Sequence, residues 1–151
     1  MRVVFKVVIL LTLFLNIFGQ EAKSKKYFFY YKLNFDKTDN FSEEKNQNEL
    51  KENEFYFVVT YNNDNLVESV GYYDPKGNIN TYLVDRYNNI FFNYITYKYE
   101  KGLLATKEFK DKDDKVLAKI NFEYNEEKRI SKTILFIYSL KKRELIKIEE
   151  T

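Results

Sequence analysis

The chain has 151 residues, which is enough for one domain but not for two independent cores. Its 44% hydrophobic and 32% charged residues exclude a disordered tail and a polytopic membrane protein. The absence of cysteine and histidine excludes a disulfide framework and thiolate metal sites, and removes the commonest general base. The 25 basic and 23 acidic side chains give a formal net charge of +2.

Residues 1–19 predict a secretory signal peptide. Arg2 and Lys6 precede an apolar run that ends at Phe18 and is shorter than the roughly 18 to 20 residues of a membrane-spanning helix. We expect cleavage after Gly19, with Ala22 as a second candidate and an uncleaved N-terminal anchor as the alternative. The expected domains are the signal peptide over 1–19 and one β-rich domain over 20–151.

Cleavage would make the exported chain neutral, because it removes two of the 25 basic side chains and none of the 23 acidic ones. A neutral chain lacks the basic surface of a nucleic-acid binder, so we expect no nucleic-acid partner. We also expect no transmembrane span after cleavage. The wealth of Asn, Lys, Ile, Phe and Tyr is typical of an AT-rich bacterial genome. From the predicted signal peptide we expect an exported protein, in a periplasm, on a cell surface or in the medium.

In chain order, the first expected strand spans residues 27–35, where aromatic side chains alternate between the two faces. The polar stretch over 36–54 predicts a long loop, with at most a helical turn. The segment over 89–99 is apolar on both faces, which is typical of a central strand covered on both sides or of one whose second face lines a pocket. Two later strands, over 116–124 and 130–138, alternate with one apolar face.

Turn-like clusters punctuate the chain from residue 55 onward. They begin near Asn62, Asp74, Tyr87, Glu100, Asp111, Asn125 and Ser139. The 14 Tyr and 14 Phe favour strands, as does the scarcity of alanine. We predict an all-β fold, an antiparallel up-and-down meander of about eight or nine strands that forms either a curled open sheet or a small closed barrel.

The meander also contains a weak internal repeat. Tyr61, Leu66, Tyr72, Asp74, Gly77 and Ile79 recur as Tyr99, Leu103, Phe109, Asp111, Asp114 and Val116. With the turn over residues 73–78, this pattern resembles the β-hairpin repeats of the bacterial YD-repeat and variant MORN-repeat families. The resemblance implies a repetitive antiparallel sheet used as a scaffold or interaction surface, and it implies no catalytic residues.

Catalytic chemistry has little support in the sequence. The serines lie in no nucleophile-elbow context, and there is no glycine-rich phosphate loop. Asp111 and Asp113 resemble the start of a calcium loop, but the required glycine and distal glutamate are missing, so a turn explains them better. We expect no enzyme, no catalytic residue, no metal site and no cofactor.

Aromatic side chains supply the candidate binding site. Tyr73, Tyr82, Phe91 and Tyr97 could line a groove or cavity and stack on a sugar, a lipid or a partner chain. Core packing is the competing explanation for the same four rings.

The sequence therefore predicts a non-enzymatic exported β-sheet protein that acts as an interaction or structural module of the bacterial cell envelope, with an unknown protein or envelope partner. The alternative is a small lipocalin-like carrier of an apolar ligand. A carrier needs an empty interior with apolar walls, whereas a scaffold needs a filled core and an exposed aromatic strip.

Overall fold

The computed structural model describes residues 24–28, 31–32, 39–42, 44–84 and 90–151. The strands are β1 (Lys25–Phe28), β2 (Tyr31–Lys32), β3 (Asn40–Phe41), β4 (Glu44–Lys45), β5 (Tyr56–Tyr61), β6 (Val67–Tyr73), β7 (Tyr82–Val84), β8 (Ile90–Phe92), β9 (Tyr94–Glu100), β10 (Leu103–Lys110), β11 (Val116–Tyr124), β12 (Ile130–Ser139) and β13 (Glu144–Glu150). A short 3-10 helix, η1 (Gln47–Glu49), precedes β5. The predicted signal peptide and the predicted turn near Tyr87 lie outside the described residues.

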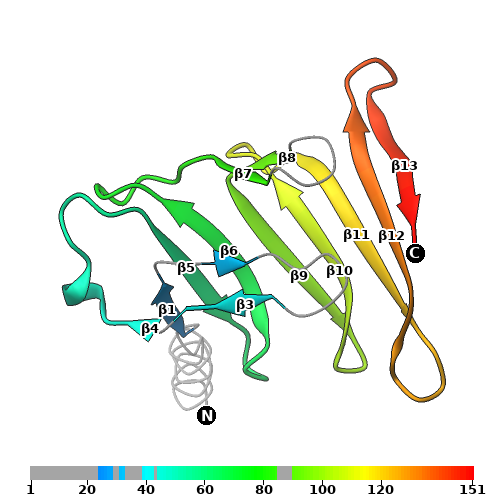
Figure 1. Ribbon diagram of the computed structural model, residues 1–151, viewed down its shortest axis with the longest axis horizontal. Coiled ribbons are helices and arrows are strands. Elements are labelled where there is room, and N and C mark those ends of the chain that lie inside the picture. Colours follow the sequence, from blue (N-terminus) through cyan, green and yellow to red (C-terminus); the bar gives the residue numbers. More distant parts are fainter. Residues whose placement is uncertain (1–23, 29–30, 33–38, 43, 85–89) are drawn as a thin grey trace, which may run out of the picture.

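The main sheet has nine antiparallel strands in the order β13-β12-β11-β10-β9-β6-β5-β1-β4 (Figure 1). From β9 to β13, each strand pairs with the next along the chain, which confirms the predicted up-and-down meander. The sheet is open, with β13 and β4 as its outer strands. Of the two predicted shapes, the curled open sheet is the one that forms, and the closed barrel does not.

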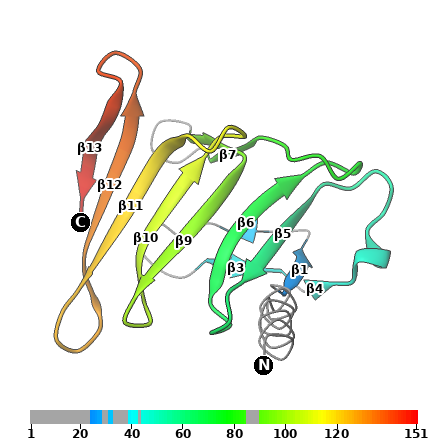
Figure 2. The ribbon, with the colours of Figure 1, turned by 180° about the vertical axis from the view of Figure 1, so that it is seen from behind.

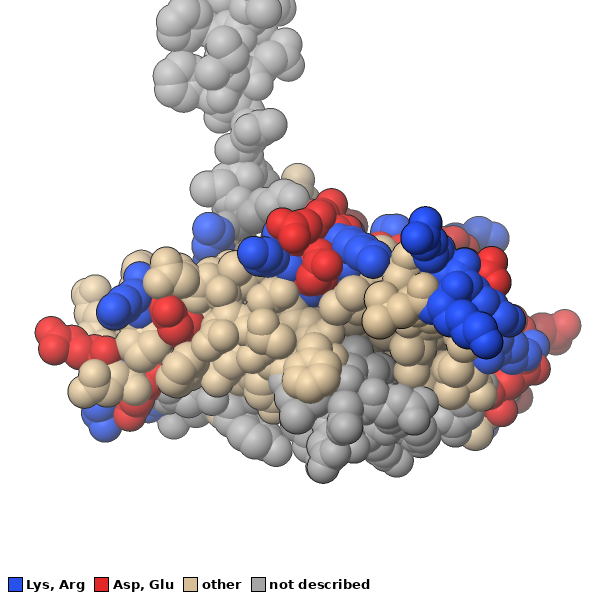
Figure 3. All heavy atoms as spheres, turned by 90° about the horizontal axis from the view of Figure 1, so that it is seen from above, with Lys and Arg blue, Asp and Glu red and all other residues tan. Residues whose placement is uncertain are grey.

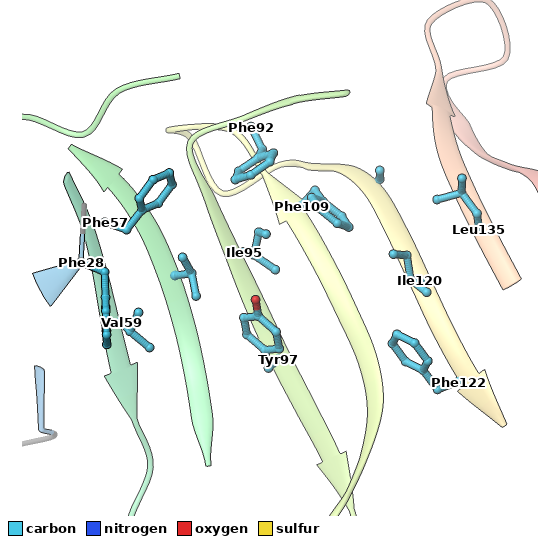
Figure 4. Close-up of a cluster of buried hydrophobic side chains, with 12 residues drawn as sticks. Phe28, Phe57, Val59, Phe92, Ile95, Tyr97, Phe109, Ile120, Phe122 and Leu135 are labelled. Carbon is cyan, nitrogen blue, oxygen red and sulfur yellow. The ribbon is translucent and has the colours of Figure 1, made fainter. Parts of the chain in front are cut away.

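One face of this sheet, here called the inner face, carries the hydrophobic core. Val59, Val70, Ile95, Phe109 and Ala118 are directly paired across five neighbouring strands, and all five side chains are fully buried (Figure 4). Because successive side chains of a strand point to opposite faces, the residues next to them lie on the other face, here called the outer face.

Two small hairpins lie over the inner face. The pairs β2–β3 and β7–β8 are on the near side of the sheet in Figure 1 and behind it in Figure 2. Phe41 of β3 places its ring 5.0 Å from the ring of Phe28, and Tyr82 of β7 meets the ring of Phe57 edge-on at 5.2 Å. The core is thus enclosed between the sheet and these hairpins.

Four turns between strands share one hydrogen-bonding geometry. They begin at Asn62, Asp74, Asp111 and Asn125. In each, a side-chain oxygen of this first residue accepts hydrogen bonds from the backbone N–H groups two and four positions later. The fourth residue has a positive φ, at Asn65, Gly77, Asp114 and Lys128. This is a type I turn closed by a left-handed residue, for which Asp or Asn as the first residue is well suited.

The N-terminal part of the domain differs from the predictions. The predicted strand over 27–35 is divided, because β1 joins the main sheet while β2 pairs with β3. The predicted long loop over 36–54 contains β3, β4 and η1. Isolated short strands of this kind are set by pairing with distant segments, such as that of Tyr27 with Lys45, so local pattern gives little signal for them.

The predicted strand over 89–99 is divided at Asn93. Its backbone N–H donates to the carbonyl of Lys110, its own carbonyl accepts from Tyr72, and its side chain donates to Thr81. The residues before Asn93 form β8 and pair with β7, whereas those after it form β9 in the main sheet. The two-sided apolar pattern therefore comes from two strands in different sheets.

Candidate functional site

The four predicted site residues do not gather at one place. Tyr82 and Tyr97 lie on the inner-face side, Tyr73 lies on the outer face, and Phe91 of β8 is 53% exposed. Each of these rings therefore has a separate environment.

Tyr82 belongs to an aromatic cluster at one end of the core. Its ring packs edge-on against Tyr72, Phe57 and Phe92, with centroid distances of 5.1, 5.2 and 5.6 Å. Edge-to-face contacts at such distances are favourable because the positive ring edge meets the negative ring face. This cluster fixes the β7–β8 hairpin to the sheet.

Tyr97 belongs to a buried polar cluster with Asp39 and Lys107. The Tyr97 hydroxyl donates to the Asp39 carboxylate, and the Lys107 Nζ donates to the same carboxylate at 2.6 Å. The Lys107 side chain is 0% exposed and that of Asp39 is 2% exposed. The Lys107 Nζ also lies 5.7 Å from the ring centroid of Phe122. Burying a cation costs free energy unless it is paired and hydrogen-bonded, which this cluster achieves.

The sequence did not predict this buried polar cluster, although the alternation along the strand points to one of its members, Lys107. Lys107 is two residues before the core residue Phe109, so a period of two places it on the inner face. Asp39 has no such signal, because it lies in a polar stretch without alternation. Since Lys107 is fully enclosed and hydrogen-bonded to Asp39, the arrangement can fix the segment around Asp39 to the sheet.

The negative charge of Asp39 also affects the pKa of Tyr99, which lies on the same strand as Tyr97. Burial is the main cause that raises the pKa of Tyr99 to about 12, followed by the negative charge of Asp39 and then by Tyr124. The Tyr124 hydroxyl donates to the carbonyl of Leu104 at 2.9 Å. Both hydroxyls are therefore protonated near neutral pH, and the hydroxyl of Tyr124 acts as a hydrogen-bond donor.

The outer face carries a second set of aromatic rings, here called the tyrosine row: Tyr27, Tyr56 and Tyr73. The ring centroids of Tyr27 and Tyr56 are 6.1 Å apart, and those of Tyr56 and Tyr73 are 5.8 Å apart with nearly parallel planes. All three side chains are half-buried. A Cβ added at Gly71 would come within 2.8 Å of the Tyr73 ring, so that ring lies over the glycine. The row thus runs across β1, β5 and β6.

Beyond Gly71 the outer face becomes charged. The Tyr94 hydroxyl donates to Asp114, which also accepts from Lys110 at 3.0 Å. Lys98 pairs with Glu108 at 2.8 Å. Burial and then the hydrogen bond to Asp114 raise the pKa of Tyr94 to about 12. Seen from above, acidic and basic atoms gather along the edge of the molecule that corresponds to the outer face (Figure 3).

No protein-family model, curated protein or solved structure matches the chain. Within the described residues, no helix is long and apolar enough to cross a membrane.

Proposed function

We propose that the protein is an exported, non-enzymatic interaction module of the bacterial cell envelope and that the outer face of its open sheet is the surface that contacts a partner. The observation that carries this proposal is the tyrosine row on a face that no described strand covers (Figure 2). Tyrosine suits such a surface, because it offers a large apolar ring and a hydroxyl at a low cost in side-chain entropy.

The different packing of the two faces of the sheet supports the proposal. The inner face is filled by packed side chains and carries the β2–β3 and β7–β8 hairpins, so it has the filled core that a scaffold needs. A lipocalin-like carrier would instead need a closed barrel around an apolar interior, and the nine-stranded sheet is open. These features favour the outer face as the binding surface.

The chemistry of the described residues also favours binding over catalysis. The most shielded ionisable groups, Lys107 and Asp39, are hydrogen-bonded to each other away from solvent. The carboxylates of the outer face, such as Glu108 and Asp114, lie in contacts with lysines. The export part of the proposal depends on the predicted signal peptide over residues 1–19.

Site-specific photocrosslinking in cells tests this proposal. A photoreactive phenylalanine analogue placed at Tyr56 and, separately, at Tyr73 should capture the same partner, because the two rings are neighbours. The same analogue at Glu127, in an exposed turn at the opposite end of the sheet, is the control. Equal capture from all three positions, or none from the tyrosine row, would overturn the proposal.

A comparison of native and denatured masses of the exported protein separates the two functions further. The interaction module should give the mass of the bare chain. A small molecule that is released on denaturation would instead favour the carrier.

A further inference from the structure

We propose that the tip of the β12–β13 hairpin docks on an anionic lipid surface. This tip comprises residues 140–143. In this arrangement Leu140 enters the headgroup region, and Lys141, Lys142 and Arg143 lie close to the lipid phosphates. The tip is separate from the tyrosine row, so the failure of one proposal leaves the other unchanged.

The first observation is the exposure of Leu140. This residue is 83% exposed, the largest value among the large hydrophobic residues that the structure describes as exposed. The next value is the 53% of Phe91. A leucine at the end of a hairpin gains nothing from the core, whereas it can bury its apolar surface in the boundary between lipid headgroups and acyl chains.

The second observation is the charge that follows Leu140. Lys141, Lys142 and Arg143 are consecutive and exposed, and among the described residues none of them forms an ion pair. The space-filling view from above shows a large group of basic atoms at the β12–β13 end of the molecule, with acidic atoms beside it (Figure 3). Cations near an anionic membrane surface are attracted to it in proportion to their number.

The other turns of the sheet make this tip stand out. The turn that starts at Asn125 holds two acids before its two cations, and the turn that starts at Asp111 holds three acids and two lysines. Neither contains a large apolar residue. The combination of a leucine with three cations and no acid is specific to residues 140–143, so it does not follow from the needs of a hairpin turn.

The position of the tip allows it to reach a flat surface. The last described pair between β11 and β12 is Ala118 with Ile137, whereas β12 and β13 continue to pair as far as Ser139 with Glu144. The hairpin therefore extends past the neighbouring strands, as Figure 1 shows. At its base, the Lys115 Nζ lies 3.9 Å from the ring centroid of Tyr138, which places a further cation next to the tip.

A lipid surface fits these residues better than another polyanion. A nucleic acid or an acidic protein would use the three cations, but it would leave Leu140 in water. Only a partner with an apolar layer directly beneath its phosphates uses both the leucine and the cations. The expected signature is therefore binding that needs both the negative charge of the lipid and the apolar side chain.

Vesicle sedimentation tests this inference. The protein should bind vesicles that contain phosphatidylglycerol and should bind much less to vesicles of phosphatidylcholine alone. The triple variant Lys141→Gln, Lys142→Gln, Arg143→Gln should partition about a hundredfold less onto the anionic vesicles. Leu140→Gln should reduce partitioning about tenfold, because it removes an apolar side chain of this size.

A matched control keeps the charge change constant. The triple variant Lys101→Gln, Lys128→Gln, Arg129→Gln removes three cations from turns at the opposite end of the sheet (Figure 1). Arg143, Lys101 and Lys128 all have a positive φ, so both triple variants substitute residues of that conformation. The control should bind like the unmodified protein. All variants share the same N-terminal segment, so differences between them report on the turns alone.

Three outcomes would overturn the inference. One is equal loss of binding in the two triple variants, which would indicate a general effect of net charge. Another is unchanged binding of Leu140→Gln. The third is binding of the protein to heparin as tight as to the anionic vesicles, which would identify an acidic polymer as the partner.

Discussion

Lys107 and Asp39 are 68 positions apart in the sequence, yet the ammonium group of one donates to the carboxylate of the other at 2.6 Å beneath the covered inner face. Neither group could be buried alone at an acceptable cost, because each would lose its hydration shell without compensation. The ion pair therefore determines where the segment around β3 lies on the sheet.

We predict that Asp39→Ala lowers the free energy of unfolding by about 3 to 5 kcal/mol, because it leaves the buried ammonium group of Lys107 without this carboxylate. Urea denaturation measures this change. The double variant Asp39→Leu, Lys107→Met should regain most of the loss, since packed apolar groups replace both charges. A double variant as unstable as Asp39→Ala would contradict this explanation.

We predict that Gly71→Ala lowers the free energy of unfolding by about 1 to 2 kcal/mol, because the new methyl group would meet the Tyr73 ring that lies over the glycine. The same substitution in a Tyr73→Ala background should cost much less. The difference between the two costs is the coupling energy between residues 71 and 73, measured in a double-mutant cycle by urea denaturation. Equal costs in both backgrounds would show that the ring does not limit the space at Gly71.

Two substitutions with opposite expected effects on stability test the role of the turn residues that have a positive φ. Lys128 has a φ of 59°, so Lys128→Gly should stabilise the protein by about 1 kcal/mol. Gly77 has a φ of 82° and ordinary space around it, so Gly77→Ala should destabilise it by a similar amount. Thermal unfolding gives both signs. Shifts in the same direction would argue against backbone conformation as the cause.

The tyrosines with raised pKa should make stability fall in alkaline solution. Tyr99 has a folded-state pKa of about 12 against an ordinary value of 10.0. The stabilisation from its protonated form is complete below pH 10.0 and is lost as the pH rises towards 12, because the unfolded state releases its proton first.

Ultraviolet titration of tyrosinate measures this effect directly. The late-titrating absorbance should decrease in Tyr99→Phe. In Asp114→Asn, the late-titrating absorbance of Tyr94 should move to lower pH, because the second cause of its raised pKa is the hydrogen bond to Asp114. A titration that is complete near pH 10.0 in the unmodified protein would contradict the prediction.

The sequence predicts the meander well because its turns carry local chemistry. Asp74 and Asn125 supply the side-chain oxygens that close their turns, and this chemistry is readable from neighbouring residues alone. Asp114 takes the left-handed position that glycine holds in the turn of Gly77, which aspartate tolerates better than most residues. The order of the strands from β9 to β13 then follows from the turn spacing.

The features that the sequence did not predict all depend on distant partners. Asn93 divides the apolar run over 89–99 because it bonds to Tyr72, Thr81 and Lys110. The tyrosine row needs the register between β5 and β6, which places Tyr56 opposite Tyr73. The predicted binding residues share an aromatic character, but that character does not reveal which face or which hairpin holds each ring.

The segment around Asp39 and β3 packs over the inner face of the sheet. In the chain it comes before most of the strands that form this face. Because the chain is synthesised from its N-terminus, Asp39 emerges long before Lys107, whereas each hairpin from β9 onward can close as soon as its second strand appears. We therefore expect the meander to assemble first and the N-terminal segment to close over it last. The rate of this final step should depend on how fast two segments that are far apart in the sequence meet, and not on how fast the turns form.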